Sequence, residues 1–429
     1  MSALILISFF CFLLLSVPVG FAMLLTSLLY VGFSGRVPVT YVCQGLVSGV
    51  TSYTVLAAPF FILTGYIMNG SGITKKIFAF ADTAVGHITG GLGHVNILAS
   101  FIFAGMSGSA NADAAGLGNI EIKAMTEKGY DADFAVGITA ASSIIGPIIP
   151  PSNPMVQLGI IAGISIGALF MGGIMVGILM ALFMFITVYV IARRRNYYKR
   201  KRASFKELWT ATREAFLALL TPVILIGGLI NGNVTPTEAG AVAILYSLII
   251  SIFVYKDLKI RDLIHVFEQA INSIGIIMLL IACGKVFAWM IGDQQIAEKI
   301  ARVLFGLSNN PWIILLIMNI FLLILGTFME TNAALTIAAP LLFPIAAAIG
   351  MNSVQFGIIF VLNLMIGLLT PPMAIVLFIT AKIGGISFEQ SVKAVSPYYI
   401  ALIVILILVN LFPAITLTIP NLVFGNYAW

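Results

Sequence analysis

The sequence predicts an all-α polytopic membrane protein made of two inverted-topology repeats, each with a re-entrant helical hairpin and a broken helix. Of its 429 residues, 60% are hydrophobic and only 9% are charged, a balance that excludes a soluble globular domain. The stretches 5–31, 134–192 and 394–429 contain no Asp, Glu, Lys or Arg, and about 20 apolar residues cross a bilayer. A constant spacing between matching motifs relates the two halves.

In the first half we expect four crossings, at 5–31, 54–70, 133–165 and 166–192, the first of which is expected to break near Pro18. Between the second and third crossings lies an apolar stretch at about 95–125 with a small, polar, glycine-rich centre. This stretch is too short for two full crossings and a turn. We therefore interpret it as a re-entrant hairpin.

The basic run at 193–202 is the strongest orientation signal, and it places this loop in the cytoplasm. A linker span at 213–231 follows. With the four crossings of the first half it brings the number of crossings before the second half to an odd value, so the second half has the opposite orientation in the membrane. In that half we expect a hairpin at about 311–349. The four crossings expected there are 236–255, 271–292, 353–383 and 396–419.

Matching motifs recur at one offset along the chain. Gly105 and Gly326, Asn111 and Asn332, Gly146 and Gly367, and the double prolines 150–151 and 371–372 are each 221 positions apart. A constant offset over several motifs indicates a duplication. The predicted units are a repeat at 1–192, a basic loop and linker helix at 193–235, and a repeat at 236–429. Inverted repeats with broken helices are typical of secondary transporters.

Helix breaks at membrane depth free backbone carbonyls, which suit a hard cation such as Na⁺. We expect two related sodium sites, one at each hairpin tip and the break that faces it. The first is predicted to use Ser107, Ser109, Asn111, Gly146, Ile149 and Pro151. The second is predicted to use Gly326, Met329, Thr331, Asn332, Gly367, Thr370 and Met373.

Half-helix N-termini suit an anionic substrate, because their N–H groups are unpaired and carry the positive end of the helix dipole. The predicted substrate-binding residues are Ser109, Asn111, Asp113, Ser152, Asn153, Glu330, Thr331 and Asn332. Asp113 and Glu330 are lone charges in long apolar regions. They are candidates to tune the cation sites, to contact substrate hydroxyls or to carry a proton. Ordinary close packing of small residues between helices is the alternative reading.

Other chemistry is not indicated. The three cysteines and three histidines are scattered, which predicts neither a disulfide framework nor a metal centre other than sodium. No nucleotide-binding loop or Ser/His pair is apparent, so we expect no enzyme and no organic cofactor. Lys285 lies within an expected span, where it either snorkels to the membrane surface or is paired with another group, and we favour snorkelling.

At these motifs the chain resembles the large membrane subunit of tripartite ATP-independent periplasmic (TRAP) transporters. The residues that carry the resemblance are Gly105–Gly116, Ser142–Ser152, Pro236–Gly240, Glu330–Asn332 and Gly367–Pro372. The resemblance implies sodium-driven import of organic acids across a bacterial inner membrane. It also implies two partners, a periplasmic substrate-binding protein and a small four-helix membrane subunit, which we expect to be a separate chain.

The same resemblance implies an elevator mechanism. The moving transport block would comprise about 75–165 and 293–383, and the remainder would form the scaffold. Sialic acid is the favoured substrate on overall likeness alone. A single-component sodium/dicarboxylate symporter, which needs no binding protein, is the main alternative. A channel is the weaker alternative, because closed hairpin tips argue against a continuous pore.

Overall fold

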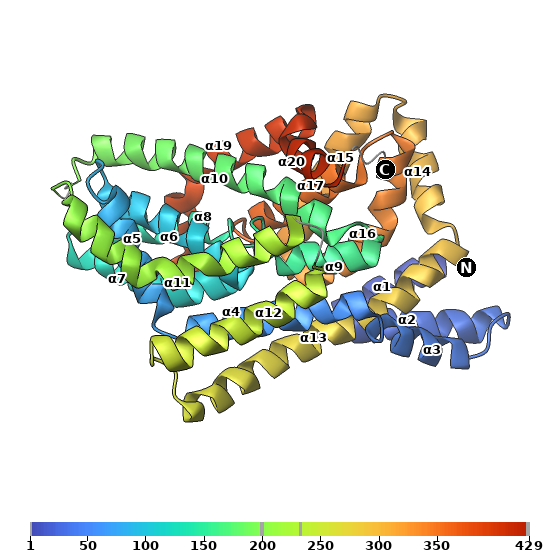
Figure 1. The fold of residues 1–429 in the computed structure, drawn as a ribbon. Coiled ribbons are helices and arrows are strands. Elements are labelled where there is room, and N and C mark those ends of the chain that lie inside the picture. The colour runs from blue at the N-terminus through green and yellow to red at the C-terminus, as the bar shows by residue number, and fades with distance from the viewer. Residues whose placement is uncertain (1, 198–200, 231–233, 426–429) are drawn as a thin grey trace.

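The computed structural model describes residues 2–197, 201–230 and 234–425. Within these ranges the chain forms twenty α-helices, one 3₁₀ turn and one π-helical turn, and no strand. Eight helical segments of the described chain are long and apolar enough to cross a membrane. The predicted all-α, polytopic fold is therefore confirmed (Figure 1).

Two helical hairpins occupy the predicted regions. The first joins α6 (Gly91–Ser107) to α7 (Ala110–Glu127), and the second joins α15 (Pro311–Phe328) to α16 (Thr331–Ala348). Each tip is only two residues long. The helices before the tips, α6 and α15, end 221 positions apart, and the helices after the tips, α7 and α16, begin 221 positions apart. The two hairpins approach the centre of the molecule from opposite ends (Figure 1).

A broken helix follows each hairpin, as expected. The first is α8 (Ala132–Ser143) and α9 (Asn153–Ala162), and the second is α17 (Ser353–Gly367) and α18 (Ile375–Gly384). Proline causes both interruptions, because it has no N–H to donate and its ring clashes with the preceding turn. The non-helical linkers at 144–152 and 368–374 each contain a double proline.

The other helices surround these elements. They are α4 (Ala57–Gly70), α5 (Ile73–Val85), α10 (Ile166–Arg194), α11 (Phe205–Ile230), α12 (Pro236–Ile249), α13 (Ile260–Asp293), α14 (Ile296–Leu307), α19 (Phe388–Leu411) and α20 (Ala414–Phe424), with the short turns η1 (Tyr53–Leu56) and η2 (Ile250–Val254). The helix α10 crosses the molecule and packs against helices of both halves, α6 and α9 from the first and α17 and α19 from the second. The first hairpin and both broken helices therefore pack against one shared helix.

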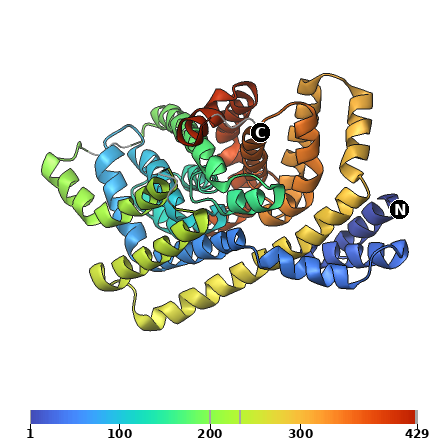
Figure 2. The same ribbon diagram turned by 45° about the vertical axis from the view of Figure 1, so that its right-hand side comes forward.

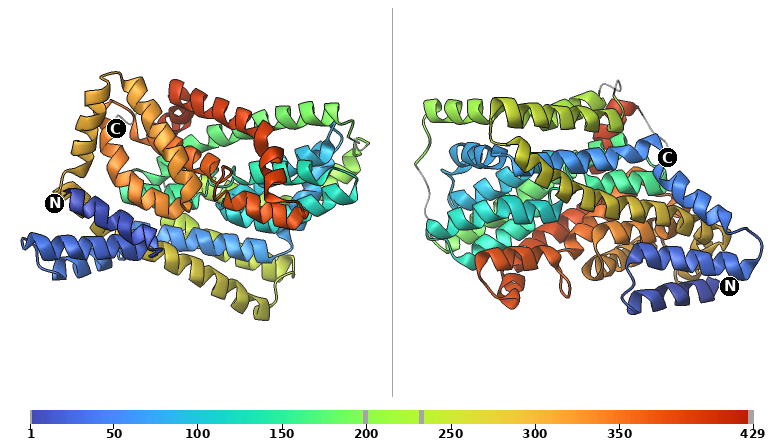
Figure 3. Two further views of the ribbon diagram at one scale, coloured as in Figure 1. Left: turned by 180° about the vertical axis from the view of Figure 1, so that it is seen from behind. Right: turned by 90° about the horizontal axis from the view of Figure 1, so that it is seen from below.

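The N-terminal region differs from the prediction. The crossing at 5–31 breaks near Pro18 as expected, but its two parts, α1 (Ser2–Leu14) and α2 (Val19–Ser34), fold back on each other instead of forming a single crossing. Ser16 adopts a positive φ of 60°, and Pro18 caps α2, so the helix cannot continue through this turn. With α3 (Thr40–Val50), these helices pack along the end of α13, beside the rest of the molecule (Figures 2 and 3). The expected last crossing is also shifted, because α19 ends at Leu411, just before Pro413.

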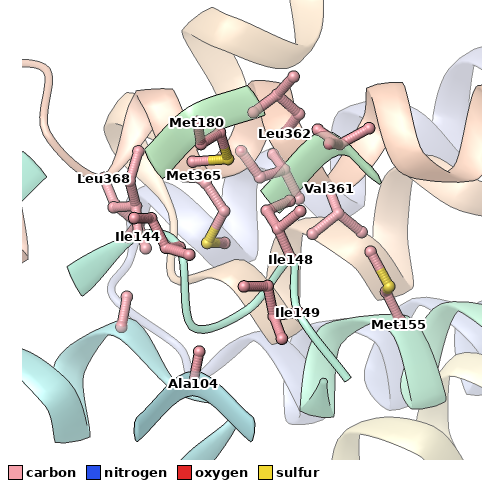
Figure 4. Packing of buried hydrophobic residues seen from close by; sticks show 14 of the residues in the cluster. Ala104, Ile144, Ile148, Ile149, Met155, Met180, Val361, Leu362, Met365 and Leu368 are labelled. Atoms are coloured by element: carbon pink, nitrogen blue, oxygen red, sulfur yellow. The ribbon is translucent and has the colours of Figure 1, made fainter. Parts of the chain in front are cut away.

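The core lies between the two halves. Ile148 and Ile149, in the linker of the first broken helix, pack among Val361, Leu362 and Met365 of α17 (Figure 4). Their burial removes both isoleucine side chains from lipid and water and fixes the path of the linker backbone. The break in one half is thus shaped by the helix that precedes the break in the other half.

A polar cluster ties the end of α10 to the start of α8. Arg195 donates to Asp131 and to Asp133 at 2.9 Å, in the second case through both of its terminal nitrogens. The hydroxyl of Tyr197 donates to Asp131. Burial and the Asp131 carboxylate raise the pKa of Tyr197 to about 12, so this phenol remains a neutral donor at physiological pH.

We expect R195M to lower the melting temperature of the purified protein, because it leaves two carboxylates facing each other without a cation. Exposed ion pairs contribute ~0.2–1 kcal/mol each, and a two-pronged arginine contact lies at the upper end of that range. R193M is the matched control, since Arg193 is exposed and its replacement removes the same charge two residues away. An equal loss in both variants would show that net charge, and not this cluster, is responsible.

Candidate functional site

The two hairpin tips meet at a small polar cavity of about 60 Å³. Its walls come from both halves of the chain and from α13. They are formed by Ala110, Asn111, Pro147, Asn153, Pro154, Ile277, Glu330, Thr331, Asn332, Met365 and Leu368. The first turns of α7, α9 and α16 all contribute, so three helix N-termini converge on this cavity.

The first tip is held by backbone contacts to the first helix break. Gly108 has a φ of 57°, a conformation that glycine adopts without strain, and its carbonyl accepts from the N–H of Asn153 at 3.4 Å. Ser109 caps α7, since its hydroxyl accepts from the Ala112 N–H at 3.4 Å. The helix α4 lies directly behind, because a Cβ at Gly65 would lie 3.2 Å from the Ser107 carbonyl oxygen.

The second tip has the corresponding backbone contact, in which the Met373 N–H donates to the Thr327 carbonyl at 3.3 Å. Here a carboxylate caps the helix. Glu330 accepts from the N–H groups of Asn332 at 2.9 Å and Ala333 at 3.2 Å, and from the Asn332 side chain at 2.8 Å. The charge of Glu330 therefore already stabilises the start of α16.

The predicted sodium residues fall into two groups around these tips. At the first tip, Gly146 lies against the Ser109 backbone, and the buried oxygens of Ser107 and Asn111 have no hydrogen-bond partner among the described residues. At the second tip, Gly326 and Gly367 are in direct backbone contact, and the Thr370 N–H donates to the Gly367 carbonyl at 2.8 Å. The side chains of Ile149 and Met373 face elsewhere, Ile149 into the core and Met373 half exposed.

Three of the eight predicted substrate residues, Ser109, Asp113 and Ser152, do not line the cavity. Asp113 is buried and lies in the first turn of α7, beside Ser100 of α6. Ser152 is also buried, and its hydroxyl donates to the Pro147 carbonyl and accepts from the Met155 N–H, which makes it the cap of α9. Neither side chain lines the cavity in this arrangement, so its contact with substrate stays a prediction. Asn111, Asn153, Thr331 and Asn332 do line the cavity.

Gln157 is a site residue that the sequence analysis missed. Its side-chain amide is buried in α9 and donates to the Asn332 carbonyl at 2.9 Å and to the Thr336 hydroxyl at 2.8 Å. It thus joins the first broken helix to the second hairpin tip. The available signal was a glutamine one turn after Asn153, within an otherwise apolar half-helix.

A second missed feature is a buried polar network behind the first hairpin. The Asn96 amide donates to Glu121 at 2.6 Å and to Thr139 at 2.7 Å, while Ser142 donates to the Asn96 carbonyl oxygen at 2.6 Å. These residues belong to α6, α7 and α8. The network links the two arms of the hairpin to the broken helix, so these three elements form one rigid unit.

Paired hairpins and broken helices around one polar cavity define a class of protein, the polytopic secondary transporters. Residues 6–415 match the family model of the tripartite ATP-independent periplasmic transporter, DctM component. The chain therefore belongs to the TRAP transporter large permease family.

Two relatives illustrate the range of this family. The sialic acid TRAP transporter large permease SiaM of Vibrio cholerae is 44% identical over 408 residues, which cover 95% of this chain and 96% of that protein. The C4-dicarboxylate TRAP transporter large permease DctM of Pseudomonas aeruginosa is 38% identical over 369 residues, 86% of each chain. The crystal structure of the Alcanivorax borkumensis YdaH transporter has a similar fold, with a TM-score of 0.58, 14% identity, and coverage of 87% of this chain and 88% of that one.

We expect G367A to destabilise the protein more than G146A, although the two glycines are equivalent in the repeat. A Cβ at residue 367 would lie 2.6 Å from the Gly326 Cα, whereas one at residue 146 meets nothing closer than 3.3 Å. Overpacking of this kind costs ~1–3 kcal/mol. Melting temperatures of both variants test the prediction, and equal losses would contradict the asymmetry of the two tips.

Proposed function

We propose that this chain is the membrane permease of a sodium-coupled importer of organic acids, with sialic acid as the first candidate substrate. A periplasmic binding protein would deliver the substrate, and a small membrane subunit would complete the transporter in the bacterial inner membrane. The likeness to relatives named as sialic acid transporters from Vibrio cholerae and Haemophilus influenzae, 44% and 42% identical, supports the substrate. The relative named for C4-dicarboxylates indicates that a carboxylate is the shared feature.

The observation that carries this proposal is the convergence of both tips on one polar cavity with buried oxygens that have no protein partner. Asn111 and Asn332, which line the cavity, and Ser107, the last residue of α6 beside the first tip, each have such an oxygen, within the part of the chain that the structure describes. A hard cation is held by oxygen ligands, so Na⁺ fits this donor set. Its binding would satisfy groups that are otherwise costly to bury.

An anionic substrate is suited to the same place. The cavity is bordered by the first residues of α7 and α16, Ala110 and Thr331, whose N–H groups carry the positive ends of their helix dipoles. Bound Na⁺ beside them would add positive charge, which links substrate affinity to sodium. This linkage is what coupled transport requires.

The small volume of the tip cavity supports the proposal that the hairpins and broken helices move during transport. A volume of about 60 Å³ is far below the ~300–1,000 Å³ of sites for small organic ligands, so the walls must separate before a sugar acid can enter. The hairpins and broken helices are tied to one another through the Asn96 network and Gln157. We therefore propose that they move together, as an elevator, against a scaffold that includes α13.

Uptake of labelled sialic acid into proteoliposomes tests this function. The chain would be reconstituted with its small membrane subunit, with or without an inward Na⁺ gradient and the binding protein. Uptake that needs both would support the proposal. Uptake that needs Na⁺ alone would favour a single-component symporter, and uptake that follows the substrate gradient without Na⁺ would favour a channel.

In this assay we expect S107A to raise the Na⁺ concentration for half-maximal uptake about tenfold, because it removes an oxygen next to a cation. S143A is the matched control, since the Ser143 hydroxyl is equally buried but donates within its own helix, to the Ala140 carbonyl at 2.9 Å. An unchanged sodium dependence in S107A would remove Ser107 from the site.

A further inference from the structure

A second and much larger cavity lies between α9, α13 and the loops around them. Its volume is about 810 Å³, within the ~300–1,000 Å³ of sites for small organic ligands. Its polar lining comes from Ser48, Ser52, Thr54 and Ser165, and its apolar lining includes Ile160, Ile281 and Phe424. Lys285 is the one charged side chain among the described residues that line it.

The position of Lys285 in α13 corrects the interpretation that it snorkels to the membrane surface. Gly284 and Val286 on either side are buried, whereas Lys285 is exposed and lines the cavity. Its ammonium group donates to the Ser48 carbonyl at 3.1 Å. A lysine has three N–H donors, so two remain to bind a ligand. A charge within a membrane-spanning helix is costly unless it faces water or a partner of opposite charge.

The large cavity and the tip cavity lie along the same two helices. On α13, Ile277 borders the tip cavity, and Ile281, Gly284 and Lys285 border the large one. These positions follow helical spacing and so share one face of α13. Lys285 is eight residues from Ile277, about 12 Å along the helix.

The helix α9 forms the opposite wall in the same way. Asn153 and Pro154 border the tip cavity, and Gly159 and Ile160 border the large one. Gln157 lies between them and holds the second tip. The two cavities are therefore consecutive spaces between a helix of the proposed moving block and a helix of the proposed scaffold.

An apolar cluster separates the two cavities. Ile277 and Ile281 pack together with Val55 and Ile62, and Ile160 of α9 joins this cluster. Such a cluster excludes water and ions while it is closed. The large cavity is consequently a vestibule in front of a closed barrier.

The vestibule lies on the side from which substrate would arrive. Arg193 and Arg194 lie in the last turn of α10 and Arg195 follows it, which marks that end as cytoplasmic. The vestibule is lined by the first residues of the same helix, Ile166 and Gly167. As α10 has 29 residues and spans about 43 Å, the vestibule faces the periplasmic side.

We propose that Lys285 is an entry subsite for the carboxylate of the substrate. An anion released into the vestibule binds the Lys285 ammonium, with the surrounding serine and threonine hydroxyls available to a polyhydroxylated acid. Opening of the isoleucine barrier then passes it to the hairpin tips. This inference rests on the proposed function, because it assigns a second binding step to the same substrate.

The first test compares K285M with K285R and K128M in the proteoliposome assay. K285M retains the length of the side chain but not its charge, and we expect it to raise the KM for sialic acid about tenfold, the effect of losing one charge-assisted contact. The sodium dependence and the maximal rate should stay within about twofold of wild type. K285R should remain near wild type, and K128M, which removes an exposed cation far from the vestibule, should be unchanged.

The outcomes separate the two proposals. Wild-type protein that transports no organic acid contradicts the proposed function. Wild-type transport with an unchanged KM in K285M contradicts the entry subsite alone. If K285M fails to fold, its melting temperature will show this. In that case a folded K285R that does not transport would contradict the subsite, because arginine retains the positive charge that the subsite needs.

A second test does not depend on transport. In a background with Cys11, Cys43 and Cys283 replaced by alanine, K285C would be treated from the periplasmic side with a membrane-impermeant thiol reagent. Modification of K285C supports a vestibule open to that side. Slower modification of S52C, a lining position in a protein that retains Lys285, with sialic acid present supports the subsite. No modification of K285C in folded protein would overturn the proposal.

Discussion

The structure depends on one constraint, that backbone N–H and C=O groups freed by a helix break must find partners inside the membrane. Each hairpin tip meets this need for the break that faces it. Asn153 donates its N–H to the carbonyl of Gly108, and Met373 donates its N–H to the carbonyl of Thr327. Since an unpaired backbone group in hydrocarbon costs several kcal/mol, tip and break stabilise each other and neither is expected to persist alone.

The unpaired N–H groups at the starts of α7 and α16 are nevertheless capped by different side chains. Ser109, a neutral hydroxyl, caps α7, whereas Glu330, a carboxylate, caps α16. The two tips, which recur 221 positions apart in the sequence, therefore differ in the chemistry of the group that caps the following helix. This difference gives a physical reason for unequal ligand affinities at the two tips, because a nearby carboxylate favours a cation and opposes an anion.

Side-chain contacts connect the two halves of the chain. Gln157 joins α9 to the second tip, and the isoleucines of the first linker pack against α17 (Figure 4). A displacement of one hairpin is therefore transmitted to the other through packed side chains and hydrogen bonds. The helix α13 provides a common wall to both cavities, against which such a unit can slide.

The sequence by itself determined the helical class, both hairpins, both breaks and most of the cavity residues, because hydrophobic length and a 221-residue repeat are local or periodic signals. The predicted residues Asn111, Asn153, Thr331 and Asn332 line the tip cavity, since each lies at or beside a break. Only the tertiary structure revealed Gln157, the withdrawal of Asp113 and Ser152 from the cavity, and the folding back of α1 on α2. These features depend on which face of a helix meets a distant segment, and that choice is made by packing between residues far apart in the chain. Lys285 shows the same limit, because its charge was evident in the sequence but the cavity it faces is built from five separate regions.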